Sequence, residues 1–332
     1  MGVRTIIVRK PGGVEALELV EAPTPKLAAG EVLIRTRSMG VSRPDILIRK
    51  GVYTWMPPLP ASPGNELTGT IEAVGAGVTA IRPGQNVLLS ARDRPVRGGC
   101  YTDFIAVPAD AVHALPANVD FDAAVVVPTY LVAYAMFHDL GVTRDAKSVF
   151  IAGATGGIGG ALVELAKGAG LTVVGSVGSD EKAAHARELG VDHVINYKTD
   201  NLIEKVLAVT GGRGVDVAFD HIIGPAFTDF LHVLADFGTL VFYNIHAPPP
   251  ARDLFAELCA VSKKTPALRL FNIHTYDADP VRRKRLTREV IDLLAAGKIN
   301  PRVGARLPMT EAAKAHELLE SGSVLGKIVL HP

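Results

Sequence analysis

Six short apolar segments alternate with helical patterns between residues 148 and 273, and this alternation is the strongest constraint on the fold. The expected strands are 148–152, 172–177, 193–197, 215–220, 239–245 and 267–273. The expected helices are 157–169, 180–189, 200–209, 225–236 and 252–263. Runs such as "VDVAFD" lack sharp polar alternation, which is typical of strands covered on both faces. The pattern predicts an α/β fold built on a doubly wound, six-stranded parallel sheet.

The segments on either side of this region have a different character. Residues 1–122 contain short β-type runs separated by Gly and Pro, such as "TIIVR" and "QNVLLSA", and predict a compact all-β region. After residue 274 we expect a charged helix in "VRRKRLTREVIDLLAAG", a short helix in "MTEAAKAHELLESG" and a terminal strand in "GKIVLHP" that return to this region. The predicted domains are therefore a β-rich domain of residues 1–122 and 275–332, with an α/β domain of residues 123–274 inserted in it.

The turn between the first strand and first helix of the α/β region reads "AGATGGIGG". Gly153 permits a tight turn, Gly156 and Gly157 allow close approach to a ligand, and Gly159 lets the helix pack against the sheet. The positive end of the helix favours an anion, most often a pyrophosphate. A flexible turn is the alternative, but the amphipathic helix and a second strand about 20 residues later favour dinucleotide binding. The candidate contacts are Gly153, Thr155, Gly156, Gly157 and Ile158.

The end of the second strand bears on the choice of dinucleotide. An Asp or Glu there binds a free ribose hydroxyl, but this strand ends without an acid. Hydroxyls and an ammonium can instead bind a 2′-phosphate, which favours NADPH over NADH. In the alternative interpretation Ser179 caps the following helix, and both roles are compatible. The candidate residues are Ser176, Gly178, Ser179 and Lys182.

Composition excludes several classes of partner. Lys plus Arg number 35 against 34 Asp plus Glu, a net charge of +1 that offers no broad field for nucleic acid. The "RRKR" run at 282–285 is expected to be a solvated helix face. The longest apolar region, "DAAVVVPTYLVAYAMF", is too short to cross a bilayer. The two cysteines, Cys100 and Cys259, form no disulfide framework, so we expect a cytoplasmic protein without membrane partners.

Several motifs together resemble the medium-chain dehydrogenase/reductase superfamily, in its zinc-independent quinone oxidoreductase branch. They are "GVSRPDILIRKGVY", "PGNELTGTIEAVGAGV", "AGATGGIGG", "ELGVDHVINY", "GVDVAFD" and "SGSVLGKIVL", in that order along nearly the whole chain. The resemblance implies a Rossmann domain inserted in a GroES-like catalytic domain. It also implies a homodimer joined through the edge of the nucleotide-domain sheet.

The chain departs from the zinc-dependent members of that superfamily at the positions of the metal ligands. Ser42 replaces a Cys, Asn65 replaces a His, and Pro44 replaces the hydroxyl that relays a proton. Glu66 and weak oxygen donors do not make a tight zinc site, so we expect no metal. Without a Lewis acid, acceptors that delocalise charge are favoured. The resemblance implies that NADPH reduces a quinone or conjugated enone, by hydride or by single electrons.

The resemblance also assigns residues by position. Ser42, Asp45 and Tyr53 are the candidate catalytic groups, although Asp45 is expected to fix its loop and Tyr53 has packing beside "WMPPLP" as its alternative. Three of the candidate cofactor contacts also have a structural alternative: Phe271 could pack in the core, Lys327 could be a solvated surface group, and Thr129 could cap the adjoining helix. The further cofactor contacts are Thr129, Tyr197, Asn244, Phe271 and Lys327.

Two rival functions stay open. An enoyl-thioester or alkenal reductase would need an acyl-carrier groove, which the sequence does not reveal. A non-catalytic relative that binds NADPH, structural or RNA-binding, is the rival from another class, and the near-neutral charge argues against RNA. Four histidines, at 193, 221, 246 and 274, fall near strand ends without metal-ligand spacing and are expected in loops or at sheet edges.

Overall fold

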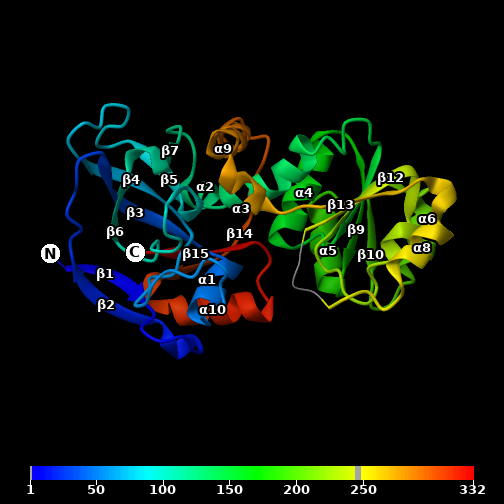
Figure 1. Ribbon diagram of the computed structural model, residues 1–332, viewed down its shortest axis with the longest axis horizontal. Coiled ribbons are helices and arrows are strands. Elements are labelled where there is room, and N and C mark those ends of the chain that lie inside the picture. Colours follow the sequence, from blue (N-terminus) through cyan, green and yellow to red (C-terminus); the bar gives the residue numbers. More distant parts are fainter. Residues whose placement is uncertain (1, 244–247) are drawn as a thin grey trace. The chain divides into compact units, whose positions relative to one another are not determined.

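The computed structural model describes residues 2–243 and 248–332 (Figure 1). The chain forms two compact units, one of residues 1–128 and 287–332 and the other of residues 129–286. We call these unit 1 and unit 2. The domain division at 122/123 and 274/275 stays a prediction.

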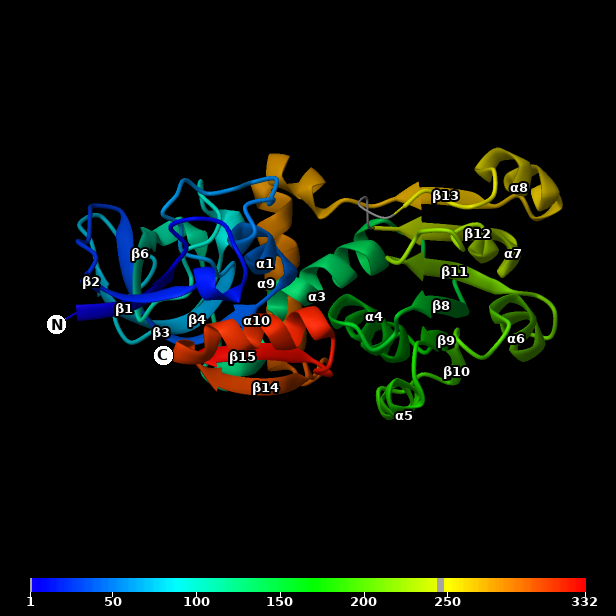
Figure 2. The same ribbon diagram turned by 90° about the horizontal axis from the view of Figure 1, so that it is seen from below.

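Unit 2 contains the six-stranded parallel sheet. Its strand order is β10-β9-β8-β11-β12-β13, the order of a doubly wound dinucleotide-binding fold, and Figure 2 shows the strands side by side in this sequence. The prediction of this sheet is confirmed. The strands are β8 (Ser148–Ala152), β9 (Thr172–Val177), β10 (His193–Asn196), β11 (Val215–Asp220), β12 (Leu234–Phe242) and β13 (Ala267–Leu270).

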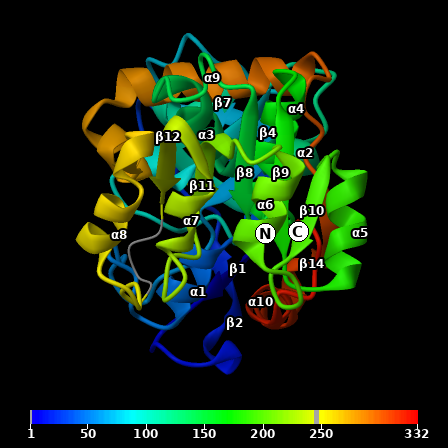
Figure 3. The ribbon, with the colours of Figure 1, turned by 90° about the vertical axis from the view of Figure 1, so that its right-hand side faces the viewer.

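Helices cover this sheet, with α5 and α8 at its opposite ends (Figure 3). All five residues of β8 are buried, which explains the continuous apolar run in the sequence. These helices are α4 (Gly157–Gly168), α5 (Asp180–Glu188), α6 (Leu202–Val209), α7 (Asp229–His232) and α8 (Leu254–Ala260). Two others, α3 (Val127–Tyr134) and α9 (Pro280–Ala295), include the residues at which the chain passes from one unit to the other. None of the helices among the described residues is long and apolar enough to span a bilayer.

The expected helix at 225–236 is wrong over most of its length. Only α7 is helical there, and β12 begins at Leu234, earlier than expected. The amide of Val215 donates to the carbonyl of Val233 (2.8 Å), and Leu234 pairs with Val215 in the sheet. Pairing with β11 therefore uses backbone groups that a longer helix would need, and this tertiary contact overrides the local helical pattern.

Unit 1 is built on two sheets. A seven-stranded sheet has the path β14-β15-β3-β4-β5-β7, with β6 also paired to β3, and β1 and β2 form a separate pair. The C-terminal strand β15 is antiparallel to β3, so the expected return of the chain to its first region is confirmed. The strands are β1 (Gly2–Ile7), β2 (Glu18–Pro23), β3 (Glu31–Val41), β4 (Glu66–Val74), β5 (Asn86–Ser90), β6 (Phe104–Pro108), β7 (Val112–Ala114), β14 (Val303–Pro308) and β15 (Lys327–His331).

The N-terminal region is not all β, which corrects the prediction. It contains α1 (Arg43–Arg49) and α2 (Phe121–Ala124), and α10 (Ala312–Ser321) comes from the C-terminal segment. Helix α1 begins with a capping box formed by Ser42 and Asp45, in which the Asp45 carboxylate accepts a hydrogen bond from the Ser42 backbone amide. Pro44 lies in its first turn. This local signal was present in "SRPD" and could have predicted the helix.

The "RRKR" segment also departs from its expected exposure. Arg283 is only 5% exposed, and its guanidinium donates to the carbonyl of Tyr276 (3.0 Å). Its neighbour Arg282 is exposed and forms an ion pair with Asp139 (2.7 Å). The run therefore fixes the start of α9 through specific contacts, rather than forming a uniformly solvated face.

Candidate functional site

The glycine turn between β8 and α4 lies beside the point where the strand order reverses, because β8 is flanked by β9 and β11. Gly153 has φ +62°, a conformation that glycine adopts without strain. A Cβ on Gly159 would lie 2.2 Å from the carbonyl oxygen of Gly153, so only glycine lets α4 pack this closely on the turn. Both roles expected of these glycines agree with the geometry.

The N-terminus of α4 is open to a ligand. Its N-cap is Gly156, and within residues 2–243 and 248–332 no side chain caps this twelve-residue helix, which leaves its first amides available to an acceptor. Gly157 lies against the methyl group of Thr129, with a Cβ position 3.4 Å away. Thr155 and Ile158 belong to the same turn and first helical residues. A pyrophosphate fits such a cradle of amides and positive helix dipole.

The candidate residues for binding a ribose phosphate at the end of β9 differ in their exposure. Ser179 is the N-cap of α5, and its hydroxyl accepts a hydrogen bond from the amide of Lys182 (3.3 Å). Ser176 is only 1% exposed, which leaves Ser179 and Lys182 as the accessible members of the group. Asp180 and Glu181, acids that the sequence argument did not weigh, occupy the first turn of α5.

Tyr197 and Gly178 lie together. A Cβ on Gly178 would come within 2.5 Å of the Tyr197 hydroxyl oxygen, so the glycine makes room for the phenol. The Tyr197 side chain is 48% exposed and follows β10 directly. An exposed ring beside the end of β9 is positioned to contact the adenosine half of a dinucleotide.

The residues expected near the nicotinamide half have mixed outcomes. Phe271 is 4% exposed and packs near Tyr276, with ring centroids 6.2 Å apart, as its core alternative implies. Asn244 lies outside the described residues. His221, which was expected at a sheet edge without a role in the site, and Tyr243, for which no role was predicted, directly follow the carboxyl ends of β11 and β12. The position of His221 directly after "VDVAFD" could have indicated a role in the site. This segment is β11, which neighbours β8 at the switch point, and ligands bind at the carboxyl ends of such strands.

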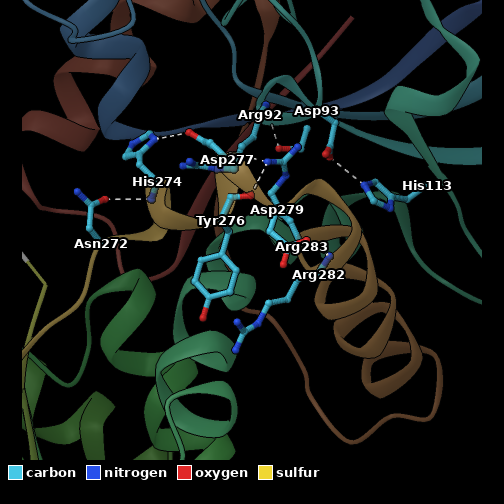
Figure 4. Close-up of polar contacts among 11 residues, drawn as sticks. Arg92, Asp93, His113, Asn272, His274, Tyr276, Asp277, Asp279, Arg282 and Arg283 are labelled. Atoms are coloured by element: carbon cyan, nitrogen blue, oxygen red, sulfur yellow. Dashed lines mark hydrogen bonds and ion pairs between the residues drawn. The ribbon is translucent and has the colours of Figure 1, made fainter.

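The segment after Phe271 is fixed by its own polar contacts, drawn in Figure 4. Asn272 accepts a hydrogen bond from the amide of His274 (3.0 Å), and the His274 imidazole pairs with Asp277 (2.8 Å). Arg283 also reaches Asp277 (3.4 Å). His274 is thus part of a local turn, as expected for a histidine near a strand end.

In unit 1 the candidate catalytic residues Ser42 and Asp45 are brought together. The hydroxyl and amide of Ser42 donate to one carboxylate oxygen of Asp45 (2.9 and 2.8 Å). The Asn65 amide group and the Gly64 amide donate to the other oxygen (2.7 and 3.1 Å). Asp45 is fully buried, and burial raises the pKa of its carboxyl to about 6. This donor set supports the expectation that Asp45 fixes its loop.

The network extends from Asp45 to a buried histidine. The Tyr101 hydroxyl donates to Asp45 (3.4 Å) and contacts His316 Nε2 (3.3 Å). On the other side His316 Nδ1 lies 3.4 Å from the buried guanidinium of Arg49, which is paired with Glu320 (2.8 Å). Burial and the Arg49 charge lower the pKa of His316 to about 4, so this imidazole is neutral near pH 7.

Lys327 on β15 and Glu66 on β4 form an ion pair across β3, the strand that lies between them. Each side chain is 8% exposed, so the pair is nearly enclosed. Gly40 makes the space for it, because a Cβ there would lie 2.6 Å from Glu66 Cγ and 2.8 Å from Lys327 Cε. Lys327 is therefore engaged with a carboxylate inside unit 1 and is not a solvated surface group.

Zinc does not fit the side chains at this end of the unit 1 sheet. Glu66 already faces the Lys327 ammonium, and the Asn65 amide group donates to Asp45. Across residues 2–243 and 248–332, His, Cys, Asp and Glu side chains form no group of three or more that could hold a metal ion. Zinc requires soft or imidazole ligands that this donor set does not supply.

Tyr53, the third candidate catalytic residue, lies beside Trp55, with ring centroids 5.7 Å apart and ring planes at 59°. This contact agrees with its packing alternative. The catalytic role stays a prediction.

Comparisons with known proteins identify the family. The model of the alcohol dehydrogenase GroES-like domain matches residues 28–117, and the model of a zinc-binding dehydrogenase matches residues 189–330. A quinone oxidoreductase of Rattus norvegicus is 30% identical over 99% of this chain and 97% of its own length. The chain belongs to the medium-chain dehydrogenase/reductase superfamily, in its quinone oxidoreductase-like branch.

Solved structures give the same fold. A structure described as an NAD-dependent alcohol dehydrogenase has a TM-score of 0.88 and 27% identity, covering 99% of both chains. A mycobacterial protein solved in complex with NADPH has a TM-score of 0.83 and 28% identity, covering 99% of this chain and 100% of that one. The family makes the chain an oxidoreductase with a nicotinamide cofactor, and the open amides of α4 fit its pyrophosphate.

Proposed function

We propose that this protein catalyses the NADPH-dependent reduction of a quinone or conjugated enone without a metal ion. The observation that carries the proposal is the Lys327–Glu66 ion pair beside Asn65, in place of a set of zinc ligands. Without a Lewis acid to stabilise an alkoxide, the acceptor itself must delocalise the incoming charge. Quinones and α,β-unsaturated carbonyls do so. The rat relative, described as a quinone oxidoreductase, supports this acceptor class.

When bound, the dihydronicotinamide supplies the reducing equivalents, and the protein's own residues bind and orient it. The amides at the start of α4 hold the pyrophosphate, and Tyr197 contacts the adenosine half. Ser42 and Tyr53 position the acceptor, while Asp45 holds Ser42, the Gly64 amide and the Asn65 side chain in place. Catalysis then depends on positioning and on excluding water from the reduced ring.

An acceptor screen tests the proposal. Purified protein is assayed with NADPH against para- and ortho-quinones, conjugated enones, alkenals, enoyl thioesters and primary alcohols, with and without a chelator. We expect turnover with quinones or enones that the chelator does not change, and poor alcohol oxidation. Preference for enoyl thioesters or alkenals would favour that rival reductase. Tight NADPH binding with no turnover would favour the non-catalytic rival, and chelator-sensitive alcohol oxidation would contradict the proposal.

The preference for NADPH rests on Ser179 and Lys182. A hydrogen bond to a charged partner contributes about 1.5–3 kcal/mol, although solvent exposure reduces it. We therefore expect Lys182→Ala to raise the Kd for NADPH about tenfold and to leave that for NADH nearly unchanged. Lys263→Ala, which removes an exposed lysine after α8, is the matched control. Equal affinities of the unmodified protein for NADPH and NADH, or equal losses for both in Lys182→Ala, contradict the assignment.

We also propose a cytoplasmic homodimer joined through β13. In the described part of the chain this strand pairs with β12 on one side only, which leaves an edge that another strand can extend. Leu270 on this strand is 53% exposed, an apolar side chain at that edge. Light scattering that gives the mass of one chain, 35.1 kDa, at micromolar concentration would contradict the dimer.

A further inference from the structure

His221 lies at the carboxyl edge of the unit 2 sheet, against the glycine turn. It directly follows β11, the neighbour of β8 across the switch point. A Cβ on Gly153 would lie 2.5 Å from His221 Cε1, so the imidazole occupies the space that a side chain at 153 would fill. The ring therefore borders the crevice in which a doubly wound sheet binds the middle of a dinucleotide.

The backbone around His221 is fixed in an unusual conformation. The buried Asp220 carboxylate accepts hydrogen bonds from the amides of Ile222 (2.8 Å) and Ile223 (2.9 Å). The Tyr243 amide donates to the Asp220 carbonyl (3.1 Å), which ties the turn to β12. Ile223 has φ +52°, a conformation that is rare for a β-branched residue. Strain of this kind concentrates at functional sites, where the surrounding contacts maintain it.

Tyr243 borders the imidazole on the side of β12. The two rings stack with centroids 5.7 Å apart and planes at 29°. The Tyr243 hydroxyl oxygen is buried and has no hydrogen-bond partner among the described residues. Burial and the Asp220 charge raise the pKa of this phenol, so it is a neutral donor. An unsatisfied buried donor beside a histidine indicates a place for a polar ligand group.

The position along the sheet determines which half of the dinucleotide this pair faces. A pyrophosphate at the start of α4 would place the adenosine half on the β9 side of the sheet, where Tyr197 lies. The β11 and β12 side, with His221 and Tyr243, therefore faces the nicotinamide half, where the acceptor reacts.

We propose that His221 donates the proton that completes reduction of the acceptor, an inference that rests on the proposed function. When bound, the dihydronicotinamide would supply a hydrogen with its electron pair to the acceptor, leaving NADP⁺. The imidazolium N–H bond of His221 breaks, and its proton goes to the acceptor oxygen that has gained charge. Acceptor, NADPH and one proton thus give reduced acceptor and NADP⁺, and solvent reprotonates the imidazole.

The surroundings suit this role. Asp220, on the strand that precedes the imidazole, is the acidic group closest in sequence, and burial raises its pKa to about 6. Tyr243 is the ionisable group that faces the ring from β12. The turn at 153–157, which packs against the imidazole, carries no ionisable side chain.

The test compares His221→Gln with the unmodified protein, using 1,4-naphthoquinone and NADPH. General acid catalysis contributes about 100- to 10,000-fold, so we expect kcat to fall at least 100-fold while the Kd for NADPH changes less than about threefold. The kcat of the unmodified protein should fall as pH rises through one ionisation, and this limb should be absent in His221→Gln. His193→Gln, at the amino end of β10, is the matched control and should retain both the rate and the limb.

Each outcome decides the inference. A folded His221→Gln that keeps its kcat, or that loses rate but keeps the pH limb, overturns it. If His221→Gln fails to fold by circular dichroism, His221→Ala is assayed with added imidazole; recovery of rate supports proton donation, and no recovery in a protein that still binds NADPH refutes it. An unmodified protein that reduces neither quinones nor enones overturns the proposed function instead, and the inference with it.

Discussion

Two substitutions in the buried network of unit 1 should change the pH dependence of its stability in opposite directions. The folded state favours neutral His316, with a pKa near 4 against an ordinary value of 6.5. The contribution of His316 to the free energy of unfolding is therefore complete above pH 6.5. It decreases as pH falls, by about 3 kcal/mol at pH 4. Folding favours protonated Asp45, with a pKa near 6 against 3.8. The ionised Asp45 therefore lowers the free energy of unfolding by about 3 kcal/mol at neutral pH, and most of this loss disappears as pH falls from 6 towards 4.

In the unmodified protein these two contributions nearly cancel between pH 7 and pH 4. Relative to it, His316→Gln should gain about 3 kcal/mol of unfolding free energy between pH 7 and pH 4, since only the Asp45 contribution is left. Asp45→Asn should lose about 2–3 kcal/mol over the same interval, because only His316 then titrates. The comparison of each variant with the unmodified protein removes the background of groups that titrate identically in both.

Urea unfolding measured at several pH values checks this. The sequence has one tryptophan, Trp55 in unit 1, so its fluorescence reports on the unit that contains both groups. Variant-minus-native differences that stay constant with pH would refute the reasoning, as would two variants that shift in the same direction. Either result would mean that the buried network adjusts its water content or geometry rather than its protonation.

Two further predictions follow from single positions. Gly159→Ala should weaken dinucleotide binding and lower the free energy of unfolding by about 1–3 kcal/mol, because the added Cβ would meet the Gly153 backbone. Gly168→Ala in the same helix should leave stability unchanged or raise it, because no atom lies within 4 Å of the added Cβ. Thermal melts and NADPH titration measure both effects. A thiol reagent should titrate the exposed Cys259 in the native protein, whereas Cys100, buried and with its pKa raised by burial, should react only on unfolding; two fast thiols under native conditions would contradict this.

The parallel sheet was predictable because its central strands are buried, so that β8 and β11 appear in the sequence as largely apolar runs without polar alternation. Where local pattern and tertiary pairing conflict, the sequence misleads. The sequence of residues 225–236 has a helical pattern, yet from Val233 onward the backbone pairs with β11. Helix α1 was missed for a different reason, since its capping box is a local signal within a region otherwise rich in strands.

The site divides in the same way. The glycine turn is local, and its φ and packing requirements can be inferred from spacing alone. The partners of Lys327 and His316 lie more than 200 residues away in sequence, at Glu66 and Tyr101, so no local pattern could identify them. His221 was visible at a strand end, but only the packing against Gly153 and Tyr243 distinguishes it from other histidines in similar positions.

The Lys327–Glu66 pair gives a physical reason why restoring ligands one at a time should not restore a zinc site. Neighbouring strands β15, β3 and β4 bring together the ammonium, Gly40 and the carboxylate. A dication placed beside Glu66 would face the Lys327 ammonium in a nearly enclosed space, where like charges repel strongly. Removing Lys327 alone would leave a buried, uncompensated carboxylate, which is destabilising. The Lys327 cation and the absence of Cys and His at positions 42 and 65 therefore form one coupled feature of these three strands, which supports the proposed reaction without a metal ion.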